Sequence, residues 1–270
     1  MSAKLNRFLK WIFGGVPVIR VTAHVSQSAP SGKLAGKNIL LTGGGRGLGY
    51  AMAGKFIQEG AKVVICGRNP DTLKKASEAL GSCAYLQLDV SQIGEFGTLF
   101  QKAEKMLGGK INCLVSNAGI SLHEHSFEEV KEEDFDRQFD TNLKGPYFLS
   151  QAFIKYARQD ADILFISSER GFCSDTIPYG LTKAALNSLT QGLAKRYSHK
   201  GIRANAIAPG VTASDMTQID KAGDLYREDN IGGRALLPEE IAESATFLLS
   251  DEAACINGCI LPCNLGNHIK

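Results

Sequence analysis

Seven short runs rich in β-branched residues alternate with longer stretches of helical character along most of this 270-residue chain. A strand, a helix and a second strand in succession form a crossover unit, which joins two parallel strands of one sheet. Repetition of this unit predicts a parallel sheet covered by helices. The expected strands are Asn38–Thr42, Lys62–Cys66, Ala84–Leu88, Cys113–Ser116, Asp162–Ser167, Arg203–Ala208 and Cys259–Cys263.

The length of the chain suits one domain with a large core and is short for two independent enzyme domains. We therefore expect residues 37–270 to form a single α/β domain, a Rossmann-type doubly wound parallel sheet of about seven strands. Residues 1–36 form a basic N-terminal extension in this division. The one long connection inside the domain, residues 211–233, is a candidate lid.

The composition favours a small-molecule substrate and argues against nucleic acid, because 30 Lys and Arg residues are balanced by 28 Asp and Glu residues. Seven cysteines, an odd number spread over a long chain, favour a reducing compartment over a disulfide scaffold. Cys255, Cys259 and Cys263 recur every four residues without a companion pair or an adjacent histidine. We interpret them as small buried hydrophobic residues and expect no metal site.

The N-terminal extension is basic, because Glu59 is the first acidic residue of the chain. Residues 8–21 are apolar but too short and too interrupted to span a bilayer. Three interpretations stay open: weak contact of residues 1–25 with a membrane surface, a mitochondrial transit peptide, and packing over a subunit. The expected location is cytoplasmic, with peripheral attachment to a membrane or mitochondrial targeting as alternatives.

A glycine-rich turn, residues 42–49 (TGGGRGLG), follows the first expected strand and opens a helical segment. Glycines allow a tight turn and a close approach of the backbone to a pyrophosphate, whose charge the free N–H groups at the helix start then meet. The candidate cofactor-binding residues of the turn are Gly43, Gly45, Arg46, Gly47, Leu48 and Gly49.

The end of the second strand indicates which dinucleotide binds. An acidic residue there would bind the ribose 2′-hydroxyl of NAD, but the sequence reads Gly67-Arg68-Asn69. Arg68 would instead pair with a 2′-phosphate, and Arg46 in the glycine turn is a second cation for the same group. The two arginines predict NADP(H).

Taken in order, these motifs and several others resemble the classical short-chain dehydrogenase/reductase family over residues 37–266. The remaining matching elements are Leu88-Asp89-Val90, Asn117-Ala118-Gly119, Asn142, Ser167-Ser168, Tyr179-x-x-x-Lys183 and Pro209-Gly210. The resemblance implies that Asp89 and Val90 flank the adenine and that Asn117, Ala118 and Gly119 support the cofactor and the sheet. It also implies that Pro209, Gly210 and either Thr212 or Ser214 hold the nicotinamide carboxamide.

The catalytic chemistry is also predicted from the residues. Tyr179 and Lys183 are four positions apart in a helical segment and therefore share one face. A neighbouring cation, with a positively charged nicotinamide, favours the phenolate and is expected to lower the tyrosine pKa. Tyr179 is the expected general acid for carbonyl reduction, with Lys183 also on the nicotinamide ribose, and Ser168 is expected to polarise the carbonyl.

Asn142 is the fourth candidate catalytic residue, in an expected helix over residues 132–158. Pro146 has no N–H to donate to the Asn142 carbonyl four residues earlier, so this carbonyl is free for another partner. In the family that partner is a water that passes protons from the catalytic lysine. A kink without functional consequence is the alternative.

The sequence departs from the family pattern at three places. The loop from Ser168 to Tyr179 is short, so Ser167 competes with Ser168 as the catalytic serine. Glu169 and Arg170 stand where small apolar residues are common, which indicates either a polar substrate group or an internal ion pair. The segment starting at Asn264 stands where an acidic residue and two glycines are usual.

The apolar residues of the candidate lid and of the segment after Gly119 predict a mostly apolar substrate of moderate size. These residues are Ile120, Leu122, Phe127, Met216, Ile219, Leu225, Tyr226 and Ile231. The nearest parallel is with 3-oxoacyl carrier-protein reductases and related hydroxysteroid and sugar-alcohol dehydrogenases. The alternatives are an epimerase of the same fold and a non-catalytic NADP-binding sensor or scaffold. A homo-oligomer, tetramer or dimer, is implied by the resemblance.

Overall fold

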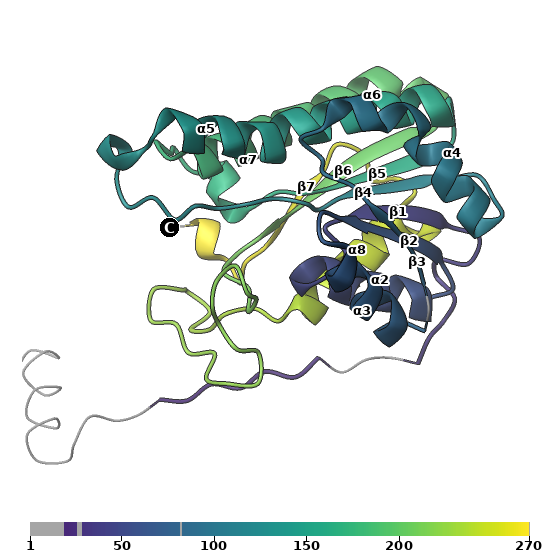
Figure 1. The fold of residues 1–270 in the computed structure, drawn as a ribbon. Helices are drawn as coiled ribbons and strands as arrows, with labels where there is room; N and C mark the ends of the chain where they lie inside the picture. Colours follow the sequence, from purple (N-terminus) through teal and green to yellow (C-terminus); the bar gives the residue numbers. More distant parts are fainter. Residues whose placement is uncertain (1–18, 26–28, 82, 270) are drawn as a thin grey trace, which may run out of the picture.

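The computed structural model describes residues 19–25, 29–81 and 83–269. Its centre is a parallel seven-stranded sheet in the order β3-β2-β1-β4-β5-β6-β7 (Figure 1), which confirms the expected Rossmann-type fold. The strands are β1 Asn38–Thr42, β2 Lys62–Gly67, β3 Ala84–Gln87, β4 Cys113–Ser116, β5 Ala161–Ile166, β6 Ile202–Pro209 and β7 Ile260–Cys263. Each expected strand is present, with ends displaced by no more than a residue or so.

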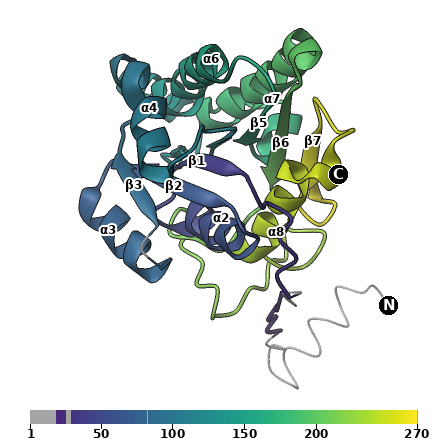
Figure 2. The same cartoon turned by 90° about the vertical axis from the view of Figure 1, so that its right-hand side faces the viewer.

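Helices cover both faces of the sheet and bury a separate apolar core on each (Figure 2). On one face α4, α6 and α7 pack around Phe100, Phe153 and Leu186. On the other, α2, α3 and α8 pack around Phe56 and Ile241. The helices are α2 Gly47–Gln58, α3 Pro70–Ala79, α4 Phe96–Leu107, α5 Glu132–Phe139, α6 Gly145–Ala157, α7 Pro178–Tyr197 and α8 Pro238–Leu249.

The strand order places a binding crevice at the carboxyl end of the sheet. β1 pairs with β2 on one side and with β4 on the other. The chain therefore adds strands first on one side of β1 and then on the other side. At such a switch point the loops after the strands diverge and leave a gap outside the carboxyl ends. The glycine-rich turn after β1 lies at this position.

The expected helix over residues 132–158 is continuous but changes geometry at Asn142. A π-helical segment, Asp140–Lys144, joins α5 to α6, and the N–H of Gly145 bonds to the carbonyl of Asp140 five residues earlier. Pro146 lies in the first turn of α6, where its missing N–H is tolerated. π segments are common at functional sites.

The connection between β6 and α8 packs beside the N-terminal arm, residues 19–25 (Figure 1). Val21 donates from its N–H to an Asp224 carboxylate oxygen at 2.9 Å, and its carbonyl accepts from the Leu225 N–H at 2.9 Å. Ala23 and Val25 pack on a small core of Ala213, Leu225, Ala235 and Leu237. Part of the extension therefore lies over this chain's own loop, while residues 1–18 lie outside the described residues.

A buried ion pair fixes the chain just before the domain. Glu59, 1% exposed, contacts the Lys55 ammonium at 3.0 Å and accepts from the backbone N–H groups of Ser31 and Lys33. Lys55 also contacts Glu243 of α8 at 2.9 Å. The start of the domain is thereby held by a carboxylate at the end of α2.

The cysteine interpretation is correct only in part. All seven thiols are free, which agrees with the expected absence of a disulfide scaffold. Cys66 and Cys113 are buried, but Cys255 is exposed and Cys259 and Cys263 are half-buried, so the four-residue spacing does not mark buried positions. In the part of the chain that the structure describes, no helix is both long and apolar enough to cross a bilayer.

Candidate active site

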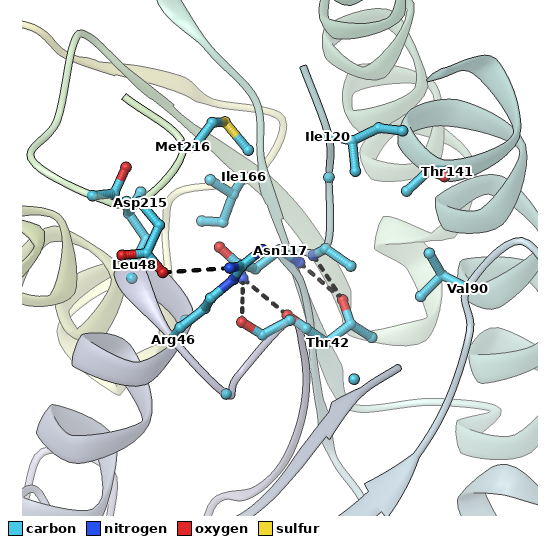
Figure 3. A pocket seen from close by; sticks show the side chains of 18 of the residues that line it. Thr42, Arg46, Leu48, Val90, Asn117, Ile120, Thr141, Ile166, Asp215 and Met216 are labelled. Atoms are coloured by element: carbon cyan, nitrogen blue, oxygen red, sulfur yellow. Dashed lines mark hydrogen bonds and ion pairs between the residues drawn. The ribbon is translucent and has the colours of Figure 1, made fainter. Parts of the chain in front are cut away.

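A cleft of about 440 Å³ opens at the carboxyl ends of β1, β4, β5 and β6, and Figure 3 shows part of its lining. Every predicted cofactor-binding residue lines it. These residues are Gly43, Gly45, Arg46, Gly47, Leu48, Gly49, Arg68, Asp89, Val90, Asn117, Ala118, Gly119, Tyr179, Lys183, Pro209, Gly210, Thr212 and Ser214. Of the four predicted catalytic residues, Ser168, Tyr179 and Lys183 line the cleft, and Asn142 does not.

The glycine turn has the close-packed geometry that a phosphate cradle requires. A Cβ at Gly49 would clash with the Gly43 carbonyl oxygen, and Gly43 itself has a φ of +69°. Gly47 begins α2 with a φ of +55°. Glycine is favoured at these positions, and the first residues of α2, 47–49, line the cleft. The residues present therefore fit a bound dinucleotide pyrophosphate.

Asn117 joins the loop after β4 to the glycine turn. Its side-chain amide donates to the carbonyls of Thr42 and Gly43 at 3.0 and 3.1 Å, and the Thr42 hydroxyl accepts from the backbone N–H groups of Asn117 and Ala118 (Figure 3). The floor of the cleft is therefore fixed between β1 and β4. This geometry fits the supporting role that the resemblance implies for residues 117–119.

Two exposed arginines flank the end of the cleft nearest β2. Arg46 points toward Asp215 (Figure 3), with 3.4 Å between the guanidinium and the carboxylate. Arg68 follows β2 and lines the same cleft, and the neighbouring Asn69 caps α3 by accepting from the Thr72 N–H at 3.0 Å. This end of the cleft is suited to an anionic group on the adenosine side of a dinucleotide.

Tyr179 and Ser168 meet at the opposite end of the cleft. Burial raises the pKa of the Tyr179 phenol above its ordinary value, although a hydrogen bond with Ser168 and the charge of Arg170 oppose the rise. Glu169 adds to it. In this structure desolvation disfavours the phenolate more strongly than the neighbouring groups favour it. The lowering expected beside a positively charged nicotinamide stays a prediction.

Lys183 is 4% exposed and lies on the same face of α7 as Tyr179, as expected. Its ammonium donates to the Ile166 carbonyl at 2.8 Å and lies 5.5 Å from the centre of the Tyr179 ring. Burial lowers the pKa of this lysine to about 8. Lys183 is therefore a buried cation beside the Tyr179 ring.

Asn142 lies behind the cleft and supports the loop after β4. Its side chain accepts from the Ile120 N–H and donates to the Ile120 carbonyl, both at 2.8 Å, in the way that one strand pairs with another. It is 1% exposed and also donates to the Thr182 hydroxyl at 3.4 Å. The side chain of Asn142 thus has a positioning role that sequence reasoning missed.

The two adjacent serines have different partners. The Ser167 hydroxyl lies 2.6 Å from the Asn187 side-chain oxygen and 3.2 Å from the Lys183 carbonyl, so its single proton is directed to acceptors on α7. The Ser168 hydroxyl lies beside Tyr179 and accepts from the Arg170 N–H at 3.3 Å. This geometry favours Ser168 as the serine that reaches a substrate.

Glu169 and Arg170 do not pair with one another, contrary to the internal ion pair expected between them. Arg170 forms a two-bond ion pair with Asp175, at 2.7 and 2.8 Å. Glu169 accepts from the side-chain amides of Asn264 and Asn267 at 3.2 and 3.1 Å. The partners come from the next loop and from the C-terminus, which the order of residues along the chain does not reveal.

The predicted apolar lining is only partly correct. Ile120 and Met216 line the cleft, but Leu225 is buried in the small core beneath the N-terminal arm, and Phe127 and Ile231 are 65% and 57% exposed. The structure also adds lining residues that sequence reasoning missed: Thr42, Asn69, Thr72, Thr141, Ile166, Asp215 and Thr217. Most of them are next to a predicted residue in the sequence. Their position near the ends of the strands could therefore have indicated that they line the cleft.

Comparison with known proteins identifies the family. A family model described as enoyl-(acyl carrier protein) reductase matches residues 43–268. A tropinone reductase homolog from Arabidopsis thaliana is 35% identical over 240 residues, which cover 83% of this chain and 90% of that protein. A 3-oxoacyl-(acyl-carrier-protein) reductase from Rickettsia felis is 34% identical over 86% of this chain and 97% of its own length.

The fold comparison agrees with the sequence comparison. A crystal structure of 3-ketoacyl-(acyl-carrier-protein) reductase from Brucella melitensis, complexed with NADH, superposes with a TM-score of 0.80 and 30% identity. The match covers 87% of this chain and 99% of that one. The chain therefore belongs to the short-chain dehydrogenase/reductase family, whose members are oxidoreductases acting on carbonyl and alcohol groups.

Proposed function

We propose that this chain is an NADP(H)-dependent oxidoreductase that interconverts a ketone or 3-oxoacyl-type carbonyl and a secondary alcohol. The observation that carries the proposal is one cleft with a phosphate-type glycine turn and two arginines at one end and the Tyr179–Ser168 pair at the other. A bound nicotinamide dinucleotide would supply the hydride that is transferred. The protein residues supply binding, orientation and the proton.

Tyr179 serves as the proton donor in the reductive direction. The raised pKa of its phenol keeps the group protonated at neutral pH, which is the form that a general acid needs. The Ser168 hydroxyl, beside the phenol, donates a second hydrogen bond to the same substrate oxygen and stabilises the developing alkoxide. In the oxidative direction the two groups act in reverse.

Lys183 and Asn142 complete the proposed catalytic set. The Lys183 ammonium is within reach of both the Tyr179 ring and the loop at Gly119, where a Cβ would lie 3.6 Å from it. It favours the phenolate left after proton donation and holds the nicotinamide ribose. The Asn142 side chain fixes the loop through Ile120. Pro146 has no N–H to donate to the Asn142 main-chain carbonyl, and this carbonyl is proposed to hold a water.

The choice of NADP over NAD rests on Arg68 and Arg46. Both line the end of the cleft next to β2, and no acidic residue follows β2 directly to bind a 2′-hydroxyl. A phosphate on the ribose would gain charge-assisted hydrogen bonds from these guanidinium groups. The Brucella protein is described with NADH, so the cofactor preference of this chain needs its own measurement.

The protein is further proposed to act as a homo-oligomer, a dimer or tetramer, in the cytoplasm. Helices α5, α6 and α7 present exposed Phe135, Tyr147 and Leu181 beside a groove that is lined by Phe139, Leu143, Phe148 and Leu189. Exposed apolar side chains gathered beside a groove support an interface between subunits at this face. Weak contact of residues 1–25 with a membrane surface stays an expectation.

The test is turnover by the purified full-length protein, followed as oxidation of NADPH or NADH with a panel of β-ketoacyl thioesters, steroids, sugars and simple ketones. We expect one substrate class to be reduced, with a higher kcat/KM for NADPH than for NADH. Tight NADPH binding without turnover of any member would favour the sensor or scaffold alternative. A preference for NADH would overturn the role given to the two arginines.

A further inference from the structure

Two of the places at which the sequence departs from the family pattern meet in space. Glu169 follows Ser168 directly, and Asn264 begins the segment after β7, yet the carboxylate of one accepts from the amide of the other at 3.2 Å. Asn267, one turn further along, donates to the same oxygen of Glu169 at 3.1 Å. An acidic group in the turn after β5 thus faces amides in the C-terminal tail, defined as residues 264–269.

The C-terminal tail and the residue before it contact three segments: the candidate lid, the turn after β5 and Gly210. Asn267 accepts from the Ile231 N–H at 3.4 Å, at the end of the candidate lid. The His268 ring lies 3.0 Å from the Asn264 side-chain oxygen and 5.5 Å from the centre of the Phe172 ring. Gly210, which lines the cleft, is held by the Cys263 carbonyl at 3.0 Å just before the tail.

The turn that carries Ser168 is fixed at both ends, by different elements. Its far end is held by α7, because Asn187 donates to the Gly171 carbonyl at 3.1 Å, and by the Arg170–Asp175 ion pair. The end next to Ser168 is held by the two amides on Glu169. Among the described residues, Tyr179 also contacts this near end, through its hydrogen bond with Ser168.

We propose that Glu169 is a positioning residue that pins the Ser168 turn, residues 168–172, to the C-terminal tail and so fixes the serine hydroxyl for the reaction. The inference rests on the proposed function for its kinetic part. One side-chain oxygen of Glu169 accepts from two amides of the C-terminal tail, so a single residue links the turn to two positions of the tail.

The hydrogen bonds between Glu169 and the C-terminal tail can be tested without any substrate, by amide hydrogen exchange in the full-length protein. Glu169→Ala is expected to accelerate exchange in residues 264–269 and 168–172, because both partners of the link are released. Glu169→Gln keeps a side-chain oxygen for the amides and is expected to retain most of the protection. Glu252→Ala, which removes an exposed acid paired with Lys33 at the other end of the molecule, is the matched control.

The kinetic arm separates positioning from general stability. Glu169→Ala is expected to lower kcat by about 10- to 100-fold, the loss that a misplaced reacting group produces, with the Kd of NADPH unchanged. Glu169→Gln should recover most of the rate. Asn267→Ala, which does not alter the turn itself, should reduce kcat in the same direction and to a smaller extent, because Asn264 still holds the carboxylate.

Two outcomes overturn the proposal. Exchange in the tail that is as slow in Glu169→Ala as in the wild type would show that the tail does not depend on this carboxylate. Wild-type kcat in Glu169→Ala, or a Glu169→Gln variant as slow as Glu169→Ala, would show that the pin does not position the serine. A wild-type protein that turns over no substrate would refute the proposed function instead, and the exchange experiment would still decide whether the pin exists.

Discussion

Lys183 brings an ammonium group into the buried part of the cleft, and the chemistry of the site depends on its charge. Burial lowers its pKa from 10.5 to about 8, so the group is largely charged at neutral pH and loses its proton only a little above it. The same shift bears on stability. The unfolded chain holds this proton up to a pH near 10.5, so the free energy of unfolding gains a contribution as pH rises from 8 toward 10.5.

The pKa of Lys183 predicts how the rate of the reaction depends on pH. In the reductive direction kcat/KM should be level near neutral pH and fall above about pH 8, as the free enzyme loses the Lys183 proton. The measurement is a pH–rate profile with NADPH at fixed ionic strength. A profile that stays level to pH 10 would contradict the role of this ammonium.

Arg68 carries the prediction on cofactor choice. Arg68→Ala should raise the Kd of NADPH by about 10- to 100-fold, the loss of a charge-assisted hydrogen bond to a phosphate, and leave the Kd of NADH nearly unchanged. Titration of both cofactors into both proteins measures the effect. Arg137→Ala, an exposed arginine on α5 away from the cleft, is the control. An equal loss of affinity for the two cofactors would show that Arg68 does not read the 2′-phosphate.

At the scale of elements, the N-terminal arm and the connection between β6 and α8 act as one unit. Val21 bonds to Asp224 and Leu225, while Ala23 and Val25 cover the small core below. Thr212, Ser214 and Met216 of the same connection line the cleft. The arm therefore stabilises the loop that closes the cofactor site.

Two truncations distinguish the effect of the arm, residues 19–25, from that of the rest of the N-terminal extension. Removal of residues 1–25 should accelerate amide exchange in residues 211–236 and raise the KM for NADPH several-fold, because the loop loses its bonded neighbour. Removal of residues 1–18 retains the arm and is the matched control. Equal behaviour of the two truncated proteins and the full chain would rule out a stabilising role for residues 19–25.

A second element contact predicts the response to acid. Although desolvation alone would raise it, the pKa of Glu59 is lowered from 4.5 to about 2 by its bonds to Lys55, Ser31 and Lys33. The carboxylate thus contributes stability above pH 4.5, and this contribution is lost as pH falls toward 2.

Glu59→Gln should therefore lower the free energy of unfolding at pH 7 by about 3 kcal/mol, in the range for breaking a buried ion pair. The difference from the wild type should shrink as pH falls below 4.5. Urea unfolding at several pH values measures it, with exposed Glu78→Gln on α3 as control. A difference that is constant with pH would contradict an ionised Glu59.

At the scale of the whole molecule, the sheet and the cofactor end of the cleft could be predicted from the sequence, because both depend on local order. Strand residues such as Ile39–Leu41 are adjacent in the chain, and the glycine turn is a single segment of eight residues. A parallel sheet then brings the ends of its strands to one edge. The predicted cofactor residues line one cleft for that reason.

The contacts that depend on long separations could not be predicted. Glu169 and Asn264 are 95 residues apart, and Val21 and Asp224 are 203 residues apart, so neither pattern nor spacing relates them. The burial that raises the pKa of Tyr179 and the bond of Lys183 to Ile166 also depend on such contacts, so the sequence does not show them. The five-residue π segment at Asn142 likewise leaves no periodic signal.

The central claim is that Tyr179 is the proton donor in a cleft that binds NADPH. The most direct measurement compares Tyr179→Phe with the wild type in two properties, the Kd of NADPH and the rate of carbonyl reduction. We predict a Kd within about twofold of the wild type and a kcat reduced by at least about 100-fold, because only the phenolic proton is lost. Substantial turnover by the phenylalanine variant, with NADPH bound as in the wild type, would contradict the account.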